Sequence, residues 1–178
     1  MPVHCIALLR AINVGGNSRV QMAELRKLGE SLGFFDVKTL LQSGNMVFDA
    51  SEADTAVLER QWETAVEKQL GVKTSFTVRS HKEWLDLVAA NPFEAEATHD
   101  PSHLLALVAR DAIGQAAIAA LRGAIRGRER IEGGERCLYA VYPNGIGESK
   151  LTVKLIERHL STPITGRNWN TVLKLAAL

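Results

Sequence analysis

A loop rich in glycine, asparagine and arginine follows the first apolar run of the chain. The segment reads LLRAINVGGNSRVQM, and its candidate ligand-binding residues are Arg10, Asn13, Gly15 and Gly16. Adjacent glycines let a backbone approach a ligand closely, a following helix N-terminus favours negative charge, and an arginine can bind an anion through two hydrogen bonds. The loop therefore predicts a site for a phosphate-type anion or, alternatively, a structural crossover. The dinucleotide and P-loop patterns GxGxxG and GxxxxGK[ST] do not occur in its sequence.

A second polar turn, Gln42-Ser43-Gly44-Asn45, separates two strand-like runs. Glycine and asparagine are typical of hairpin turns because both tolerate unusual backbone angles. The alternative is a functional one, in which Ser43 and Asn45 donate hydrogen bonds to a ligand at the end of a sheet. Both interpretations are open at the level of the sequence.

A basic stretch, YPNGIGESKLTVK, lies in the C-terminal third of the chain. Ser149 is a candidate N-cap for a helix, on which Lys150, Lys154 and Arg158 recur at spacing four along one face. Such a stripe is typical of a solvated helix face. It would also suit contact with an anion or with a nucleic-acid backbone.

The segment GRNWNTVLK places Arg167 directly before Asn168 and Asn170, which flank a tryptophan. Asn168 or Thr165 is a candidate cap for a last helix, and Trp169 is a candidate buried anchor. The alternative is that Arg167 and the two asparagines form part of a polar ligand site.

Composition and charge exclude several classes of protein. The net charge of +1 gives no global field that would draw the chain to nucleic acid or to an anionic membrane. Residues 136–178 nevertheless carry six Lys and Arg against two Asp and Glu, so a modest basic patch is expected there. The sequence has no RNP-like strand, which disfavours nucleic acid as a partner. With no apolar stretch of 18 residues and no signal-peptide pattern, we expect a cytoplasmic protein without a membrane span.

The cysteines and histidines point to no metal and no cofactor. Cys5 and Cys137 each lie in an apolar run, so we expect buried free thiols, with a bridge between neighbouring strands as the alternative. The five histidines show no zinc-ligand spacing. No nucleophile with the flanking signature of a catalytic triad occurs, and no catalytic residue or oligomeric state is predicted.

The apolar patterns predict two halves of the chain with the same order of elements, and the polar segments lie between these elements or at their ends. In the first half the predicted order is strand, helix, strand, strand, helix, strand: Val3–Leu9, Met22–Leu32, Val37–Leu41, Met46–Phe48, Ala56–Leu70 and Val72–Val78. This is the order of the ferredoxin-like βαββαβ unit. A linking helix is expected after Ser80, followed by a loop that contains Glu94 and Glu96.

The same order is predicted again in the second half: Leu104–Ala109, Ile113–Ile125, Arg128–Ile131, Arg136–Tyr142, Ser149–Leu160 and Pro163–Thr165, with a terminal helix Asn168–Leu175. We therefore predict an α+β protein of two ferredoxin-like units, in which helices pack on one face of each antiparallel sheet. Residues 1–79 would form the first unit. Residues 80–178 would form the linking helix, the second unit and the C-terminal helix, packed with the first as one compact protein.

Four of these segments together resemble a known bacterial family. LLRAINVGG, LLQSGNMVF, YPNGIGESKLT and RNWNTVLKL, in this order, are similar to the signature of the domain-of-unknown-function family DUF1697, over about residues 3 to 175. The family pattern has glycine where this chain has Ala11, which stiffens the loop without removing a functional group. The resemblance implies a small bacterial protein of paired ferredoxin-like units and brings no established activity.

Three functional hypotheses follow. The first is a binding module, in which Arg10, Asn13, Gly15, Gly16, Ser43 and Asn45, with Lys150 and Arg167, hold a small anion of phosphate or nucleotide type. The second is a hydrolase of acyl-phosphate-like substrates, in which Arg10 binds phosphate and Asn45 orients water, an analogy with other ferredoxin-like proteins. The third is a non-catalytic structural or interaction protein, in which the polar segments are turns and caps.

Overall fold

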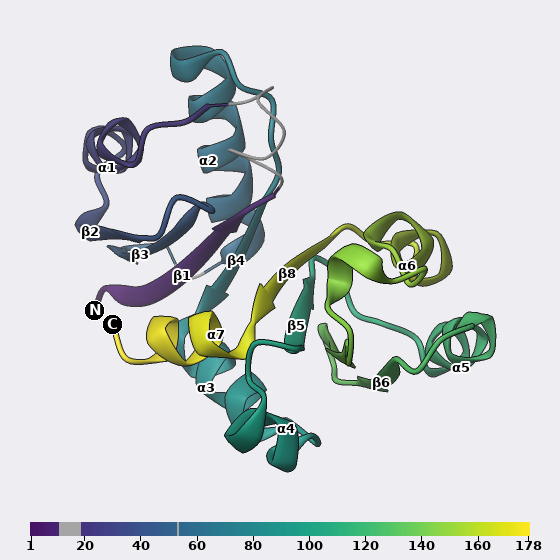
Figure 1. The fold of residues 1–178 in the computed structure, drawn as a ribbon. Helices are drawn as coiled ribbons and strands as arrows, with labels where there is room; N and C mark the ends of the chain where they lie inside the picture. Colours follow the sequence, from purple (N-terminus) through teal and green to yellow (C-terminus); the bar gives the residue numbers. More distant parts are fainter. Residues whose placement is uncertain (11–18, 53) are drawn as a thin grey trace. The chain divides into compact units, whose positions relative to one another are not determined.

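The computed structural model describes residues 1–10, 19–52 and 54–178 and is drawn in Figure 1. The first half contains β1 (Val3–Leu9), α1 (Met22–Ser31), β2 (Phe35–Leu40), β3 (Asn45–Ala50), α2 (Thr55–Leu70) and β4 (Phe76–Ser80). The helices α3 (His81–Ala89) and α4 (Glu94–His99) follow. The second half contains β5 (Leu104–Ala109), α5 (Gln115–Ala124), β6 (Arg130–Gly133), β7 (Cys137–Val141), a 3-10 turn (Ile146–Glu148), α6 (Val153–Leu160), β8 (Ile164–Asn168) and α7 (Trp169–Ala176).

The described strands form two four-stranded antiparallel sheets. The strand order is β2-β3-β1-β4 in the first sheet and β6-β7-β5-β8 in the second. In each, the first strand lies between the third and the fourth, as in the ferredoxin-like unit. The predicted α+β fold of two such units is confirmed.

Two helices cover one face of each sheet because apolar side chains alternate along the strands. In the first sheet, Cys5, Ala7 and Leu9 of β1 share a buried core with Leu25 of α1 and Trp62 of α2. The corresponding core of the second sheet contains Leu105, Leu107, Ala109, Ile118 and Ile156.

The chain divides into two compact units. Unit 1 comprises Met1–Asp86 together with Leu175–Leu178, and unit 2 comprises Leu87–Lys174. One boundary falls inside α3 and another inside α7. Each unit has its own sheet and its own pair of covering helices.

Several predicted elements are wrong at their bounds or in kind; for example, β3 is Asn45–Ala50, β6 is Arg130–Gly133 and β8 is Ile164–Asn168. Three further differences are larger or bear on the predicted site. β4 begins at Phe76 and not at Val72, because Phe76 pairs with Leu9, the last residue of β1, and β1 offers no partner upstream of it. The acidic stretch predicted as a loop is helical, as α4. α6 begins at Val153, because the Thr152 hydroxyl, and not that of Ser149, accepts a helical N–H, from Leu155 at 3.2 Å. Lys150 therefore precedes the helix.

Both cysteines are buried free thiols, as predicted. Burial, with the negative charges of Glu83 and Asp49, raises the pKa of the Cys5 thiol to about 12. Across the described residues, no cluster of three or more His, Cys, Asp or Glu side chains is arranged to hold a metal ion. In the same part of the chain, none of the helices has the length and hydropathy needed to span a membrane.

Candidate functional site

Three segments of unit 1 meet at the carboxyl end of β1. The Leu9 N–H donates to the Gly44 carbonyl at 2.8 Å, and the Arg10 N–H donates to the Ser75 carbonyl at 3.0 Å. The Thr74 hydroxyl donates to the Arg10 carbonyl at 2.8 Å. The residue after β1, the β2–β3 turn and the segment before β4 therefore lie at one edge of the sheet.

The polar side chains at this edge differ in exposure. Arg10 is half-buried, whereas Ser43 of the β2–β3 turn and Lys73, next to Thr74, are exposed. Sequence reasoning missed Lys73 because its segment was assigned to a strand. We name Arg10, Ser43 and Lys73, with the Thr74 and Ser75 backbone, the β1-edge site. Asn13, Gly15 and Gly16, also predicted for it, lie outside the described residues.

Asn45 closes the β2–β3 turn. Its side chain is fully buried, and its Nδ2 donates to the Leu40 carbonyl at 2.8 Å and to Ser43 Oγ at 2.9 Å. These two bonds use both hydrogens of the amide. The turn also contains positive φ angles, +61° at Leu41 and +81° at Gly44, and the glycine accommodates its angle without strain.

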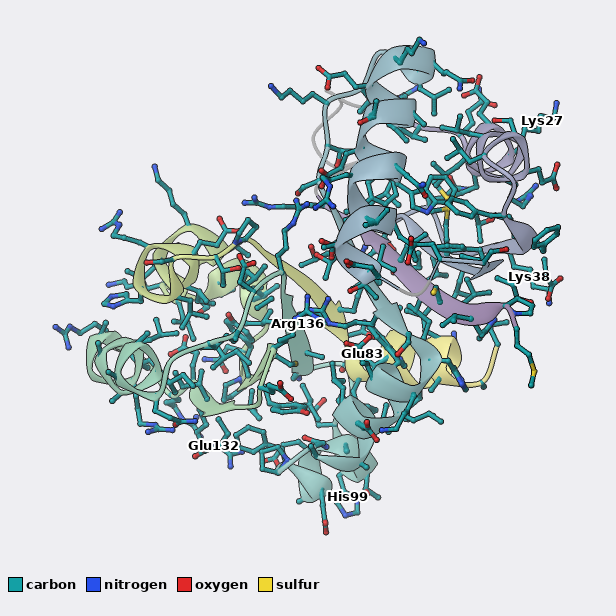
Figure 2. The ribbon with its side chains drawn as sticks, turned by 180° about the vertical axis from the view of Figure 1, so that it is seen from behind. Lys27, Lys38, Glu83, His99, Glu132 and Arg136 are labelled. Atoms are coloured by element: carbon teal, nitrogen blue, oxygen red, sulfur yellow. The ribbon has the colours of Figure 1, made fainter. Side chains whose placement is uncertain are left out.

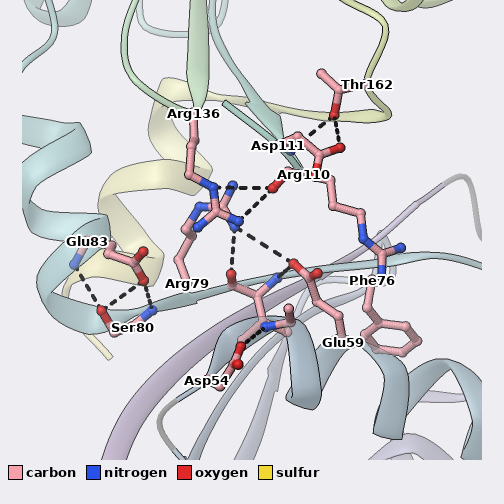
Figure 3. Close-up of polar contacts among 12 residues, drawn as sticks. Asp54, Glu59, Phe76, Arg79, Ser80, Glu83, Arg110, Asp111, Arg136 and Thr162 are labelled. Atoms are coloured by element: carbon pink, nitrogen blue, oxygen red, sulfur yellow. Dashed lines mark hydrogen bonds and ion pairs between the residues drawn. The ribbon is translucent and has the colours of Figure 1, made fainter. Parts of the chain in front are cut away.

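Unit 2 repeats the backbone geometry of the β1-edge site at the end of β5. The Ala109 N–H donates to the Arg136 carbonyl at 2.9 Å, and the Arg110 N–H donates to the Pro163 carbonyl at 3.0 Å. Arg110 therefore corresponds to Arg10, and Thr162, which precedes Pro163, corresponds to Thr74. The Arg136 guanidinium also donates to the Arg110 carbonyl, from Nη2 at 2.6 Å and from Nε at 3.2 Å (Figure 3).

A carboxylate distinguishes the edge of unit 2 from that of unit 1. Asp111 follows Arg110; its Oδ2 accepts the Thr162 hydroxyl at 2.9 Å, and its N–H donates to Thr162 Oγ1 at 3.1 Å (Figure 3). In unit 1 the residue after Arg10 is Ala11 by sequence, which has no carboxylate. Unit 2 therefore carries an acidic group of its own beside this edge.

Arg167 and Asn168, predicted as ligand-binding residues, make contacts that support β8 and α7. Arg167 Nη1 donates to the Gly166 carbonyl at 2.8 Å, and burial lowers the pKa of this guanidinium to about 10. Asn168 Oδ1 accepts the Thr171 N–H at 3.0 Å and so caps α7. Trp169 is buried, as predicted for an anchor, and Asn170 is exposed.

Lys150 lies in a different part of unit 2, between the 3-10 turn and α6. It is exposed, and the neighbouring Ser149 donates its hydroxyl to Glu129 Oε1 and accepts the Leu151 N–H at 3.0 Å. These contacts explain why Ser149 fixes the approach to α6 and does not cap the helix.

Sequence reasoning also missed a histidine–carboxylate pair at the other end of β1. His4 Nδ1 lies 2.6 Å from Asp49 Oδ1 on the adjacent strand, and the His4 and His81 rings are 5.2 Å apart. His81 Nε2 donates to the Ala176 carbonyl at 2.9 Å, since a carbonyl can only accept. A search for metal-ligand spacing along the sequence could not find this pair, because its members are 45 residues apart.

Comparisons with known proteins agree with the fold. A family described as "Protein of unknown function (DUF1697)" matches residues 3–139, so the segments around Lys150 and Arg167 lie beyond the matched range. The conserved bacterial protein SP0830 from Streptococcus pneumoniae has a similar structure, with a TM-score of 0.78 and 22% identity over 99% of this chain and 98% of that one. At this identity the likeness concerns the fold alone. Among curated proteins, none matches the chain.

Proposed function

We propose that this chain, which belongs to the DUF1697 family, binds a small anion of phosphate type at the β1-edge site of unit 1. Arg10 would supply charge and two hydrogen bonds, Ser43 a hydroxyl donor and Lys73 a second cation. Asn13, Gly15 and Gly16 remain sequence-based candidates for the same site.

One observation carries the proposal: equivalent edges of the two units differ by a carboxylate. In unit 2 the arginine at this position is followed by Asp111, held by two hydrogen bonds to Thr162. In unit 1 the corresponding position is alanine. The edge of unit 1 thus retains the arginine and has no counterpart of Asp111, although Glu63 accepts the Phe76 N–H at 3.0 Å next to Ser75. The lack of this one carboxylate favours an external anion there.

The geometry favours binding over the hydrolase alternative. In that alternative Asn45 orients a water molecule. The Asn45 amide, however, donates its hydrogens to the Leu40 carbonyl and Ser43 Oγ, and the side chain is fully buried. For Asn45 and Asn168 the contacts support the third hypothesis, in which these residues stabilise a turn and a helix end.

Calorimetry with inorganic phosphate, pyrophosphate and a nucleoside monophosphate tests the proposal. We expect binding by the wild-type chain and an affinity about tenfold to a hundredfold lower for Arg10→Ala, because a hydrogen-bonded charge contributes about 1.5–3 kcal/mol. Arg110→Ala is the matched control, since it removes the equivalent arginine beside Asp111, and it should bind as the wild type does.

Thermal unfolding in the presence of each ligand gives an independent readout, because a ligand at 100 times its Kd stabilises the folded state by about 2.7 kcal/mol. If none of the three anions binds, or if folded Arg10→Ala retains full affinity, the proposal is wrong. Equal losses in Arg10→Ala and Arg110→Ala would also contradict it.

A further inference from the structure

Two adjacent helices of unit 2 present a basic surface. α5 and α6 pack side by side on the same face of the second sheet (Figure 1), with Ile118 and Ile156 in their common core. Arg122, the exposed cation of α5, pairs with Glu132 at 3.2 Å. The other exposed cations on α6 or in the loops beside the two helices are Arg126, Arg128, Lys150, Lys154 and Arg158, which we name the α5–α6 basic face. Lys154 and Arg158 are four residues apart on α6 and share one side of it.

The helices themselves contribute almost no negative charge to this surface. The sequence of α5, QAAIAALRGA, contains no acidic residue. The one acidic residue of α6 is Glu157, whose Oε1 accepts the N–H of Ile164 at 2.9 Å. Glu157 is thus engaged with the edge of β8.

A hydrogen bond joins the two loops that carry the remaining cations. The Ser149 hydroxyl donates to Glu129 Oε1, so the segment before α6 is tied to the loop after α5. The segments that contain Lys150 and Arg128 are therefore held together. This bond lowers the pKa of Glu129, which keeps the carboxylate charged. Set against Glu129, Glu148 and Glu157, the five cations leave this surface two positive charges in excess.

Most of these cations are not neutralised by the protein itself. In the part of the chain that the structure describes, no ion pair involves Arg128, Lys150, Lys154 or Arg158. The exposed α5 residues Ala116, Ala119 and Ala120 are small. A charged polymer can therefore approach the backbone of α5 closely.

We propose that the α5–α6 basic face binds the phosphate backbone of a nucleic-acid duplex. Cations spread over α6 and the loops after α5 and before α6 match a repeating line of phosphates better than a single small anion. The sequence has no Phe, Tyr or Trp from Ile113 to Gly134 or from Ile146 to Ser161, so bases of a single strand would find no stacking platform.

An anionic membrane fits this surface less well. Membrane-surface helices insert large apolar side chains next to their basic residues. None of the large apolar side chains that are exposed in the described residues belongs to α5 or α6. Binding to a bilayer would then depend on the electrostatic attraction of the basic side chains alone.

Fluorescence anisotropy with a labelled duplex, at several salt concentrations, tests the proposal on the full chain. The test variant is Arg128→Gln/Lys154→Gln/Arg158→Gln. The matched control, Lys27→Gln/Arg60→Gln/Lys68→Gln, removes three exposed cations from α1 and α2 of unit 1, where Lys27 points into solvent (Figure 2). Both variants change the net charge equally, and thermal unfolding verifies that each is folded.

We expect the wild-type chain to bind duplex DNA or RNA with affinity that falls steeply with salt. The test variant should bind at least about tenfold more weakly, with a salt slope smaller by about three, one for each lost phosphate contact. The control variant and Arg10→Ala should bind as the wild type does.

Three results would overturn the proposal. The first is no duplex binding at low salt, and the second is an equal loss in the test and control variants, which would indicate net charge alone. The third is binding to vesicles containing anionic lipid, or to single strands, in preference to the duplex. None of these results concerns the β1-edge site, because Arg10 and its neighbours are unchanged in both triple variants.

Discussion

Replacing Asn45 by alanine tests whether the β2–β3 turn is held by its own side chains. The Asn45 amide donates to the Leu40 carbonyl at 2.8 Å and to Ser43 Oγ at 2.9 Å from a fully buried position. Alanine removes both hydrogen bonds. At about 1 kcal/mol net for each bond, we expect the free energy of unfolding to fall by about 2 kcal/mol.

Two further variants separate the contributions to this value. Ser43→Ala removes one acceptor, but Ser43 is exposed and water can replace it, so we expect a loss below about 1 kcal/mol. Asn45→Asp keeps the shape of the side chain and places a carboxylate oxygen against the Leu40 carbonyl. Since two acceptors then face each other in a buried position, the loss should at least equal that of alanine.

Urea unfolding followed by tryptophan fluorescence measures these differences. Trp62 and Trp84 of unit 1 and Trp169 of unit 2 are buried, so the emission reports the unfolding of both units, including the one that contains the turn. A change smaller than about 0.5 kcal/mol for Asn45→Ala, the range of an ordinary surface substitution, would refute the structural interpretation. Asn45 would then return to the candidate ligand-binding residues.

Two more predictions concern α7 and the thiols. Asn168→Ala removes the oxygen that accepts the Thr171 N–H, so urea unfolding should show a loss of about 1 kcal/mol, whereas exposed Asn170→Ala should change stability by less than about 0.5 kcal/mol. Equal effects of the two substitutions would contradict the cap. Because burial raises the pKa of Cys5 to about 12, its thiol stays protonated at pH 8, and an aromatic disulfide reagent should modify it only after denaturation. Rapid modification of Cys5 in the native chain would show that this burial is wrong.

Two strands could be predicted from the sequence to the residue. β1 and β5 have the predicted bounds, because each is a largely apolar run that ends at an arginine. The start of β4 could not be predicted in this way. Val72 extends the apolar pattern upstream, although the strand begins at Phe76. The start of α6 could not be predicted from the sequence either, since Ser149 and Thr152 are both favourable N-cap residues. Only the contact of Ser149 with Glu129, 20 residues away, decides between them.

The sequence could predict single segments of the candidate site but not the contacts that bring these segments together. Arg10 and the turn that contains Ser43 can be recognised from their residue types and neighbouring sequence. The hydrogen bonds of the Leu9 and Arg10 N–H groups, which join the turn to the segment before β4, are long-range contacts. Lys73 therefore had no sequence signal that linked it to Arg10. The basic face is similar, because the loops that carry Arg128 and Lys150 are joined by a tertiary hydrogen bond between Glu129 and Ser149.

Some polar contacts recur at equivalent positions of both units, and these are best explained as scaffold. Arg79 and Arg167 each donate to the carbonyl of the residue before them, at 2.7 and 2.8 Å. Ser80 and Asn168, at the ends of the last strands, each accept an N–H three residues further on. Neither unit needs a ligand to account for these contacts.

Function is then to be sought where the two units differ. The edge after β1 lacks the carboxylate that Asp111 supplies after β5. The helices covering the first sheet carry several glutamates, whereas α5 carries none and α6 carries one. Surface substitutions change stability little, so the stability of each unit does not dictate the charge of these exposed helix faces. The β1-edge site and the α5–α6 basic face are therefore separate candidates, and Arg10→Ala and the triple variant of unit 2 should each weaken one binding activity and leave the other intact.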